Sequence, residues 1–98
     1  MRIIIVNISR NIRRPNSVIH ATKRAWKLNI RHANNADYVI GVTNGSVQGY
    51  FKILNVINDR IHPDRIAFKL RNCTRQERTR VDNRIRNENL KRFVTKYI

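Results

Sequence analysis

The chain has 98 residues and a formal net charge of +15, because 21 Lys and Arg residues outnumber 6 Asp and Glu residues. This length predicts a single domain, residues 1–98, and the charge predicts a polyanionic partner, with nucleic acid favoured over an anionic membrane. The single Cys73 excludes an intramolecular disulfide and a cysteine-based zinc site, and no apolar run reaches membrane length, so we expect a soluble, cytoplasmic protein.

The N-terminal region begins with a continuous apolar run, Ile3 to Val6, which predicts an interior β-strand over Arg2–Ile8. The segment that follows, Ser9–Asn16, is predicted as a loop. It carries Arg10, Arg13 and Arg14, which either contact phosphate or are solvated. Residues 1–36 hold eight basic and no acidic side chains, so this region is one of two basic flanks.

Ser17 is a suitable N-cap for an amphipathic helix that we expect to reach Leu28 or Asn29. At 3.6 residues per turn its apolar side chains share one arc, and a basic stripe lies opposite: Lys23, Arg24 and Lys27, continued by Arg31. No acidic residue interrupts this stripe, so it is a candidate phosphate contact as well as a candidate solvated face. Trp26 lies at the border, where it either packs over the core or stacks on a base. Residues Arg31–Ala36 are predicted as a polar connection.

Tyr38–Ile57 reads as a β-hairpin around Asn44-Gly45, because Asn-Gly tolerates the positive φ values of a type I′ turn. A regular two-residue turn pairs Val42 with Val47, Ile40 with Gly49 and Tyr38 with Phe51 on one apolar face. The other face would pair Val39 with Tyr50 and Asp37 with Lys52. The alternation breaks near Ile53-Leu54, which predicts a bulge or a bend into a barrel.

The C-terminal region is predicted as a strand over Arg65–Arg71, followed by a helix from Arg75 to about Leu90. Thr74 and Glu77 have the spacing of a capping box at the start of this helix. The helix is rich in arginine and its apolar stripe is narrow, so we expect it to order against nucleic acid or a second chain. Lys91–Ile98 forms either a closing strand or a terminal helical turn.

Three segments together resemble a pattern found in PUA-like domains, the superfamily that includes the EVE and ASCH domains. They are Ala21-Thr22-Lys23-Arg24-Ala25-Trp26-Lys27-Leu28, Ala36–Val42 and Asn44–Ile53. The resemblance covers about the middle third of the chain. It implies a small mixed or antiparallel β-barrel with flanking helices that binds RNA or modified DNA bases. The small size and Asn-, Arg- and Ile-rich composition also look like those of phage accessory proteins, which act in the host cytoplasm.

The sequence offers little for catalysis or for a cofactor. There is no phosphate-binding glycine loop, the acidic residues are scattered, and the three histidines lack metal-ligand spacing. We therefore expect no metal and no cofactor. A metal-independent ribonuclease similar to RelE-like messenger-cleaving toxins is an alternative, which would use His20, His62 or Tyr50.

We conclude from the sequence that this is an α+β protein, a PUA-like barrel with an N-terminal amphipathic helix and a C-terminal basic helix. We expect non-catalytic binding of nucleic acid, with RNA favoured over DNA. A second alternative is an RNA-assisted inhibitor of a host defence protein such as a toxin–antitoxin ribonuclease, and the sequence leaves a homodimer open. The expected binding residues are Arg10, Arg13, Arg14, Lys23, Arg24, Trp26, Lys27, Arg31, Arg75, Arg78, Arg80 and Arg84.

Overall fold

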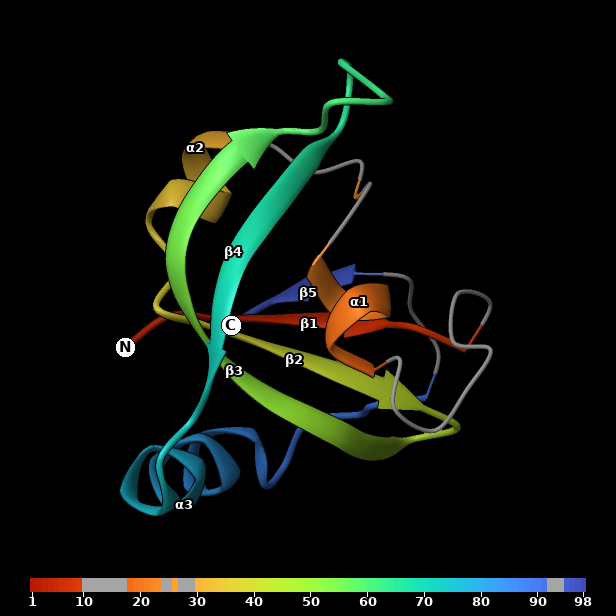
Figure 1. Ribbon diagram of the computed structural model, residues 1–98. Coiled ribbons are helices and arrows are strands. Elements are labelled where there is room, and N and C mark those ends of the chain that lie inside the picture. The colour runs from red at the N-terminus through yellow and green to blue at the C-terminus, as the bar shows by residue number, and fades with distance from the viewer. Residues whose placement is uncertain (10–17, 24–25, 27–29, 92–94) are drawn as a thin grey trace.

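The structure is a computed structural model that describes residues 1–9, 18–23, 26, 30–91 and 95–98. Strands and helices are mixed along the chain, which confirms the predicted α+β class (Figure 1). The described elements are β1 (Ile3–Asn7), α1 (Val18–Lys23), α2 (Ile30–Asn34), β2 (Tyr38–Thr43), β3 (Ser46–Asn58), β4 (Ile66–Asn72), α3 (Arg75–Ile85) and β5 (Thr95–Tyr97).

The strands form one five-stranded mixed sheet in the order β4-β3-β2-β1-β5. β1 runs parallel to β2, and the other neighbours are antiparallel. Ile3 to Val6 are fully buried, so the predicted interior strand is confirmed. The edge strands β4 and β5 are not paired with each other among the described residues, and closure into a barrel stays a prediction.

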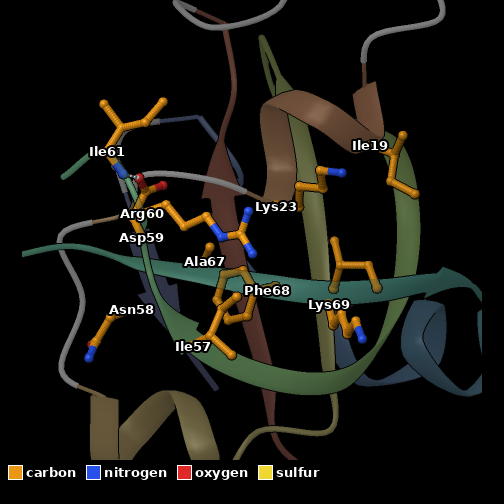
Figure 2. A pocket seen from close by; sticks show the side chains of 11 residues that line it. Ile19, Lys23, Ile57, Asn58, Asp59, Arg60, Ile61, Ala67, Phe68 and Lys69 are labelled. Carbon is orange, nitrogen blue, oxygen red and sulfur yellow. Dashed lines mark hydrogen bonds between the residues drawn. The ribbon is translucent and has the colours of Figure 1, made fainter. Parts of the chain in front are cut away.

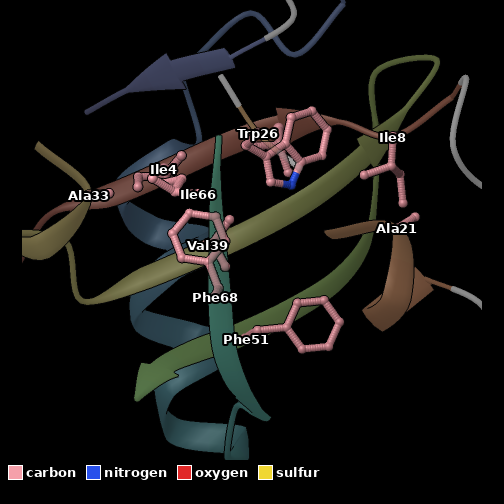
Figure 3. Close-up of a cluster of buried hydrophobic side chains, with 10 residues drawn as sticks. Ile4, Ile8, Ala21, Trp26, Ala33, Val39, Phe51, Ile66 and Phe68 are labelled. Atoms are coloured by element: carbon pink, nitrogen blue, oxygen red, sulfur yellow. The ribbon is translucent and has the colours of Figure 1, made fainter. Parts of the chain in front are cut away.

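Each face of the sheet carries its own apolar core, because β1 and β2 are apolar at nearly every position. On the first face Ile4, Val6, Val39, Phe51 and Phe68 pack with Ala21 of α1, Ala33 of α2 and Trp26 (Figure 3). On the second face Ile3, Ile5, Tyr38, Ile40 and Val42 pack with Val81 and Ile85 of α3. The helices α1 and α3 therefore contribute to cores on opposite faces.

The predicted hairpin turn is confirmed. Asn44 and Gly45 have φ values of 50° and 80°, the left-handed backbone that this turn requires. The predicted pair Val42–Val47 is also present.

Beyond that pair the predicted register is wrong by one residue. A β-bulge places Gln48 as an extra residue in β3, so Ile40 pairs with Tyr50 and Tyr38 pairs with Lys52. Phe51 pairs with Val39 and faces the first core, whereas a regular two-residue turn predicts a place opposite Tyr38. The ion pair between Lys52 Nζ and an Asp37 carboxylate oxygen still forms, at 3.9 Å.

A second bulge lies where the sequence predicted an irregularity. Ile53 pairs with Leu70 and Asn55 pairs with Lys69, which leaves Leu54 as the extra residue. Two bulges within one strand increase its local twist and bend, and β3 follows a strongly curved path in Figure 1.

The N-terminal helix is shorter than predicted. α1 ends at Lys23, and Trp26 instead forms an antiparallel bridge with Ile66 at the start of β4. The Trp26 amide donates to the Ile66 carbonyl at 3.1 Å, and the Ile66 amide donates back at 3.0 Å. An extended residue paired to a strand cannot continue a helix, so the expected run to Leu28 is wrong at this position. The predicted polar connection after Arg31 contains a further short helix, α2.

The C-terminal elements agree in type with the prediction. β4 spans Ile66–Asn72, and α3 begins after Thr74 as predicted but ends at Ile85, about one turn before Leu90. Of the two alternatives for the last residues, the strand is the one observed, because β5 pairs with β1.

Candidate nucleic-acid interface

The arginine-rich helix α3 begins with the capping box that its sequence predicts. The Thr74 hydroxyl accepts from the Glu77 amide at 3.2 Å, and the Glu77 carboxylate accepts from the Thr74 amide at 2.8 Å. These two bonds satisfy amides at the helix start that have no partner within the helix. Local sequence therefore fixes where the helix begins.

The same Glu77 side chain holds α3 against the sheet. Its carboxylate accepts two hydrogen bonds from the Arg71 guanidinium at 2.8 and 3.1 Å, and one from the Tyr38 hydroxyl at 3.2 Å. The Arg71 hydrogen bonds, followed by the Thr74 amide, lower the pKa of Glu77 to about 2. Burial, followed by the Glu77 hydrogen bond, raises the pKa of Tyr38. The negative charge of Glu77 thus attaches α3 to the sheet.

The other acidic residue of α3, Asp82, is also hydrogen-bonded to a side chain of the sheet. The Tyr50 hydroxyl donates to its carboxylate, and burial together with this hydrogen bond raises the pKa of Tyr50 to about 12. Arg78 lies over the ring of Tyr50, with its guanidinium carbon 5.0 Å from the ring centroid. Both acids within α3 are therefore hydrogen-bonded to side chains of the sheet.

All four predicted arginines of α3 are exposed, because the buried positions of this helix are Glu77, Val81 and Ile85. They do not share one stripe. Arg80 and Arg84 lie one turn apart on the same side, Arg78 lies over Tyr50, and Arg75 points elsewhere, as the 3.6-residue period requires. Arg84 also lines a cavity of about 480 Å³ together with the exposed Arg2. We refer to Arg80, Arg84 and Arg2 as the arginine flank.

The arginine flank contains an unfavourable pair. Like charges four residues apart on a helix destabilise it by about 0.2–0.5 kcal/mol. Among the residues that the structure describes, neither Arg80 nor Arg84 forms an ion pair with an acidic side chain. The helix therefore carries exposed positive charge that an external anion would neutralise.

The other predicted binding residues are less informative. Arg31 of α2 is exposed, and Lys23 of α1 is half-buried beside an apolar groove described below. Arg10, Arg13, Arg14, Arg24 and Lys27 lie outside the described residues.

Trp26 does not have the exposed ring that base stacking needs. Its side chain is 6% exposed and packs in the core of the first face (Figure 3). In a continued helix the Trp26 amide would donate to the Thr22 carbonyl four residues earlier. That amide is bonded to Ile66 instead, and the indole Nε1 of Trp26 donates to the Thr22 carbonyl at 2.6 Å. This geometry supports the core interpretation of Trp26 over the stacking interpretation.

Two parts of the surface were missed from the sequence. Arg2 is not among the predicted binding residues, because it lies far in the sequence from α3 and only the fold brings them together. A groove of about 440 Å³ was also missed, because its lining comes from α1, from β3 with the turn that follows it, and from β4 (Figure 2). No short sequence pattern could have shown either feature.

The comparisons with known proteins add no relative: no protein-family model, no curated sequence and no solved structure matches this chain. The resemblance to PUA-like domains therefore stays a prediction. Within the described part of the chain, no group of three His, Cys, Asp or Glu side chains could hold a metal ion. Over the same residues, no helix is long and apolar enough to cross a membrane.

Proposed function

We propose that this protein is a non-catalytic nucleic-acid-binding protein, with RNA as the favoured ligand, and that the arginine flank contacts backbone phosphates. The observation that carries the proposal is the exposed pair Arg80–Arg84 on a helix whose own acids, Glu77 and Asp82, are hydrogen-bonded to side chains of the sheet. Arginine suits this role because its planar guanidinium can donate two hydrogen bonds to one phosphate.

The charge of the whole chain supports the same proposal. A net charge of +15 on 98 residues opposes folding through self-repulsion, and binding a polyanion relieves that repulsion. The attachment of α3 to the sheet through Glu77 also favours binding. The backbone of the helix that carries Arg80 and Arg84 is already held in place, so binding does not have to order it.

The test is the salt dependence of binding to a labelled single-stranded RNA, measured by fluorescence anisotropy with a duplex DNA of equal length in parallel. Each phosphate contact on a single strand contributes a slope of about −0.7 in log affinity against log salt. The double variant Arg80→Gln, Arg84→Gln should therefore lose about 1.4 from the slope, which is about 25-fold in affinity at about 0.1 M salt.

A matched control separates a local contact from loss of total charge. The double variant Arg60→Gln, Lys91→Gln removes the same charge from exposed residues outside α3. It should change affinity much less. Equal losses in the two double variants would contradict a contact at the arginine flank, and absence of salt-dependent binding by the wild type would contradict the function. RNA recovered intact supports a non-catalytic role, whereas cleavage supports the ribonuclease alternative.

The finer expectations stay proposals beside this one. A closed PUA-like barrel is supported by the curvature of β3, and it would require pairing that joins the edge strands β4 and β5. A phage-encoded origin and a location in the host cytoplasm rest on composition alone.

A further inference from the structure

A second exposed surface lies away from α3, in the groove between α1, the end of β3 and β4 (Figure 2). Its floor contains Phe68 and Ala67, both buried, and its wall contains Ile19. Two further wall residues, Ile57 and Ile61, are 43% and 66% exposed. Exposing large aliphatic side chains to water costs free energy, and their grouping around a groove is typical of an interaction site.

The position of Ile61 is fixed by the turn that carries it. The buried Asp59 carboxylate accepts from the amides of Ile61 and His62 at 2.8 and 3.0 Å, and the Asp59 amide donates to the Arg65 carbonyl at 2.8 Å. This turn chemistry holds the Ile61 backbone beside the groove. Exposure of Ile61 is therefore a property of an ordered turn.

The groove is rimmed by positive charge. Lys23 comes from α1, Arg60 from the turn and Lys69 from β4, and all three are among the lining residues that Figure 2 draws. The one carboxylate in the lining belongs to Asp59 and is already bonded to the turn amides. A ligand for this groove must combine apolar groups with several separated negative charges.

We propose that the groove docks an acidic segment of a partner protein, with aliphatic side chains in the groove and Asp or Glu carboxylates at Lys23, Arg60 and Lys69. Stacking of a nucleobase is disfavoured, because the aromatic ring in the lining, Phe68, is 3% exposed and the accessible wall is aliphatic. A second copy of this chain is disfavoured because it would bring an identically charged rim against this one. A fatty acid offers one carboxylate for three cations that come from three different elements.

This proposal is independent of the proposed function, because α3 contributes no residue to the groove. The experiment begins with selection of peptides from a random displayed library on the immobilised full-length protein, at physiological salt. We expect enrichment of peptides that contain Leu, Ile, Val or Met together with several Asp or Glu residues.

An enriched peptide is then synthesised with a fluorescent label, and its affinity is measured for four variants. Ile61→Asn and Lys69→Glu alter exposed groove residues and should each weaken binding about tenfold or more. Leu54→Asn is the matched control, because Leu54 is 57% exposed on the same strand as Ile57 but outside the groove. Leu54→Asn and Arg80→Gln should leave the affinity within about twofold of the wild type.

The opposite results overturn the proposal. No enrichment, enriched peptides without carboxylates, or peptides that bind Ile61→Asn as tightly as the wild type would each do so. Saturable binding of poly(U) or dodecanoate that is lost in Ile61→Asn would assign the groove to a different occupant. A dimer seen by sedimentation that Ile61→Asn dissociates would assign it to a second copy.

Discussion

Trp26 has two proposed roles, packing in the core and stacking on a nucleobase, and the variant Trp26→Phe distinguishes them. The substitution keeps an aromatic ring but removes the indole donor that bonds the Thr22 carbonyl at 2.6 Å, and Thr22 is fully buried. A buried acceptor without a partner costs about 1–3 kcal/mol, and the smaller ring loses about 1 kcal/mol of apolar burial. The free energy of unfolding should therefore fall by about 2–4 kcal/mol.

The measurement is urea unfolding followed by far-ultraviolet circular dichroism, which does not depend on the lost indole. For a domain of this size each kcal/mol corresponds to about 4–8 °C, so the melting temperature should fall by about 8–32 °C. Wild-type indole fluorescence should resist quenching by acrylamide, because the side chain is 6% exposed. RNA affinity, measured where the variant is folded, should stay within about twofold. A stability loss below about 0.5 kcal/mol with a large loss of RNA affinity would refute the core role and restore stacking.

Two further predictions concern titratable groups that hold α3 to the sheet. The folded-state pKa of Glu77 is lowered from 4.5 to about 2, so its contribution to stability is present above pH 4.5 and is lost as the pH falls toward 2. Glu77→Gln should therefore show a flatter decline of stability over this window in urea titrations, and an unchanged pH dependence would argue against the Arg71 pairing. The pKa of Tyr50 is raised from 10 to about 12, so its contribution is complete below pH 10 and is lost between pH 10 and 12. Tyr50→Phe should remove this loss of stability between pH 10 and 12. In the wild type, the absorbance of tyrosinate should show one tyrosine that ionises well above pH 10. Ionisation of every tyrosine near pH 10 would contradict the hydrogen bond from Tyr50 to Asp82.

The hairpin shows both the reach and the limit of the sequence pattern. Asn44-Gly45 has a strong local preference, and the turn forms as predicted. The register beyond Val42–Val47 depends on the bulge at Gln48. The hydrophobic pattern of the sequence does not reveal this bulge, because both faces of the sheet are apolar. When the core lies on both faces, a shift by one residue still buries apolar side chains, so the pattern cannot detect it.

The N-terminal helix shows tertiary structure overriding local propensity. The amphipathic period continues through Trp26, yet its amide and carbonyl bond to Ile66 of β4, about forty residues later in the chain. The candidate site has the same limit. Exposure of the α3 arginines followed from the narrow apolar stripe of that helix, but the proximity of Arg2 to Arg84 and the lining of the groove depend on how the sheet joins distant elements.

The bulge at Leu54 has a consequence for how the length of this chain can vary. Ile53 pairs with Leu70 and Asn55 pairs with Lys69, so their partners on β4 are already consecutive. Deletion of Leu54 would make Ile53 and Asn55 consecutive, and each would keep its partner on β4 and its side of the sheet. The deletion would remove a side chain that is 57% exposed. The cost would be a straighter β3. Leu54 can therefore be lost over evolutionary time while each core keeps its members.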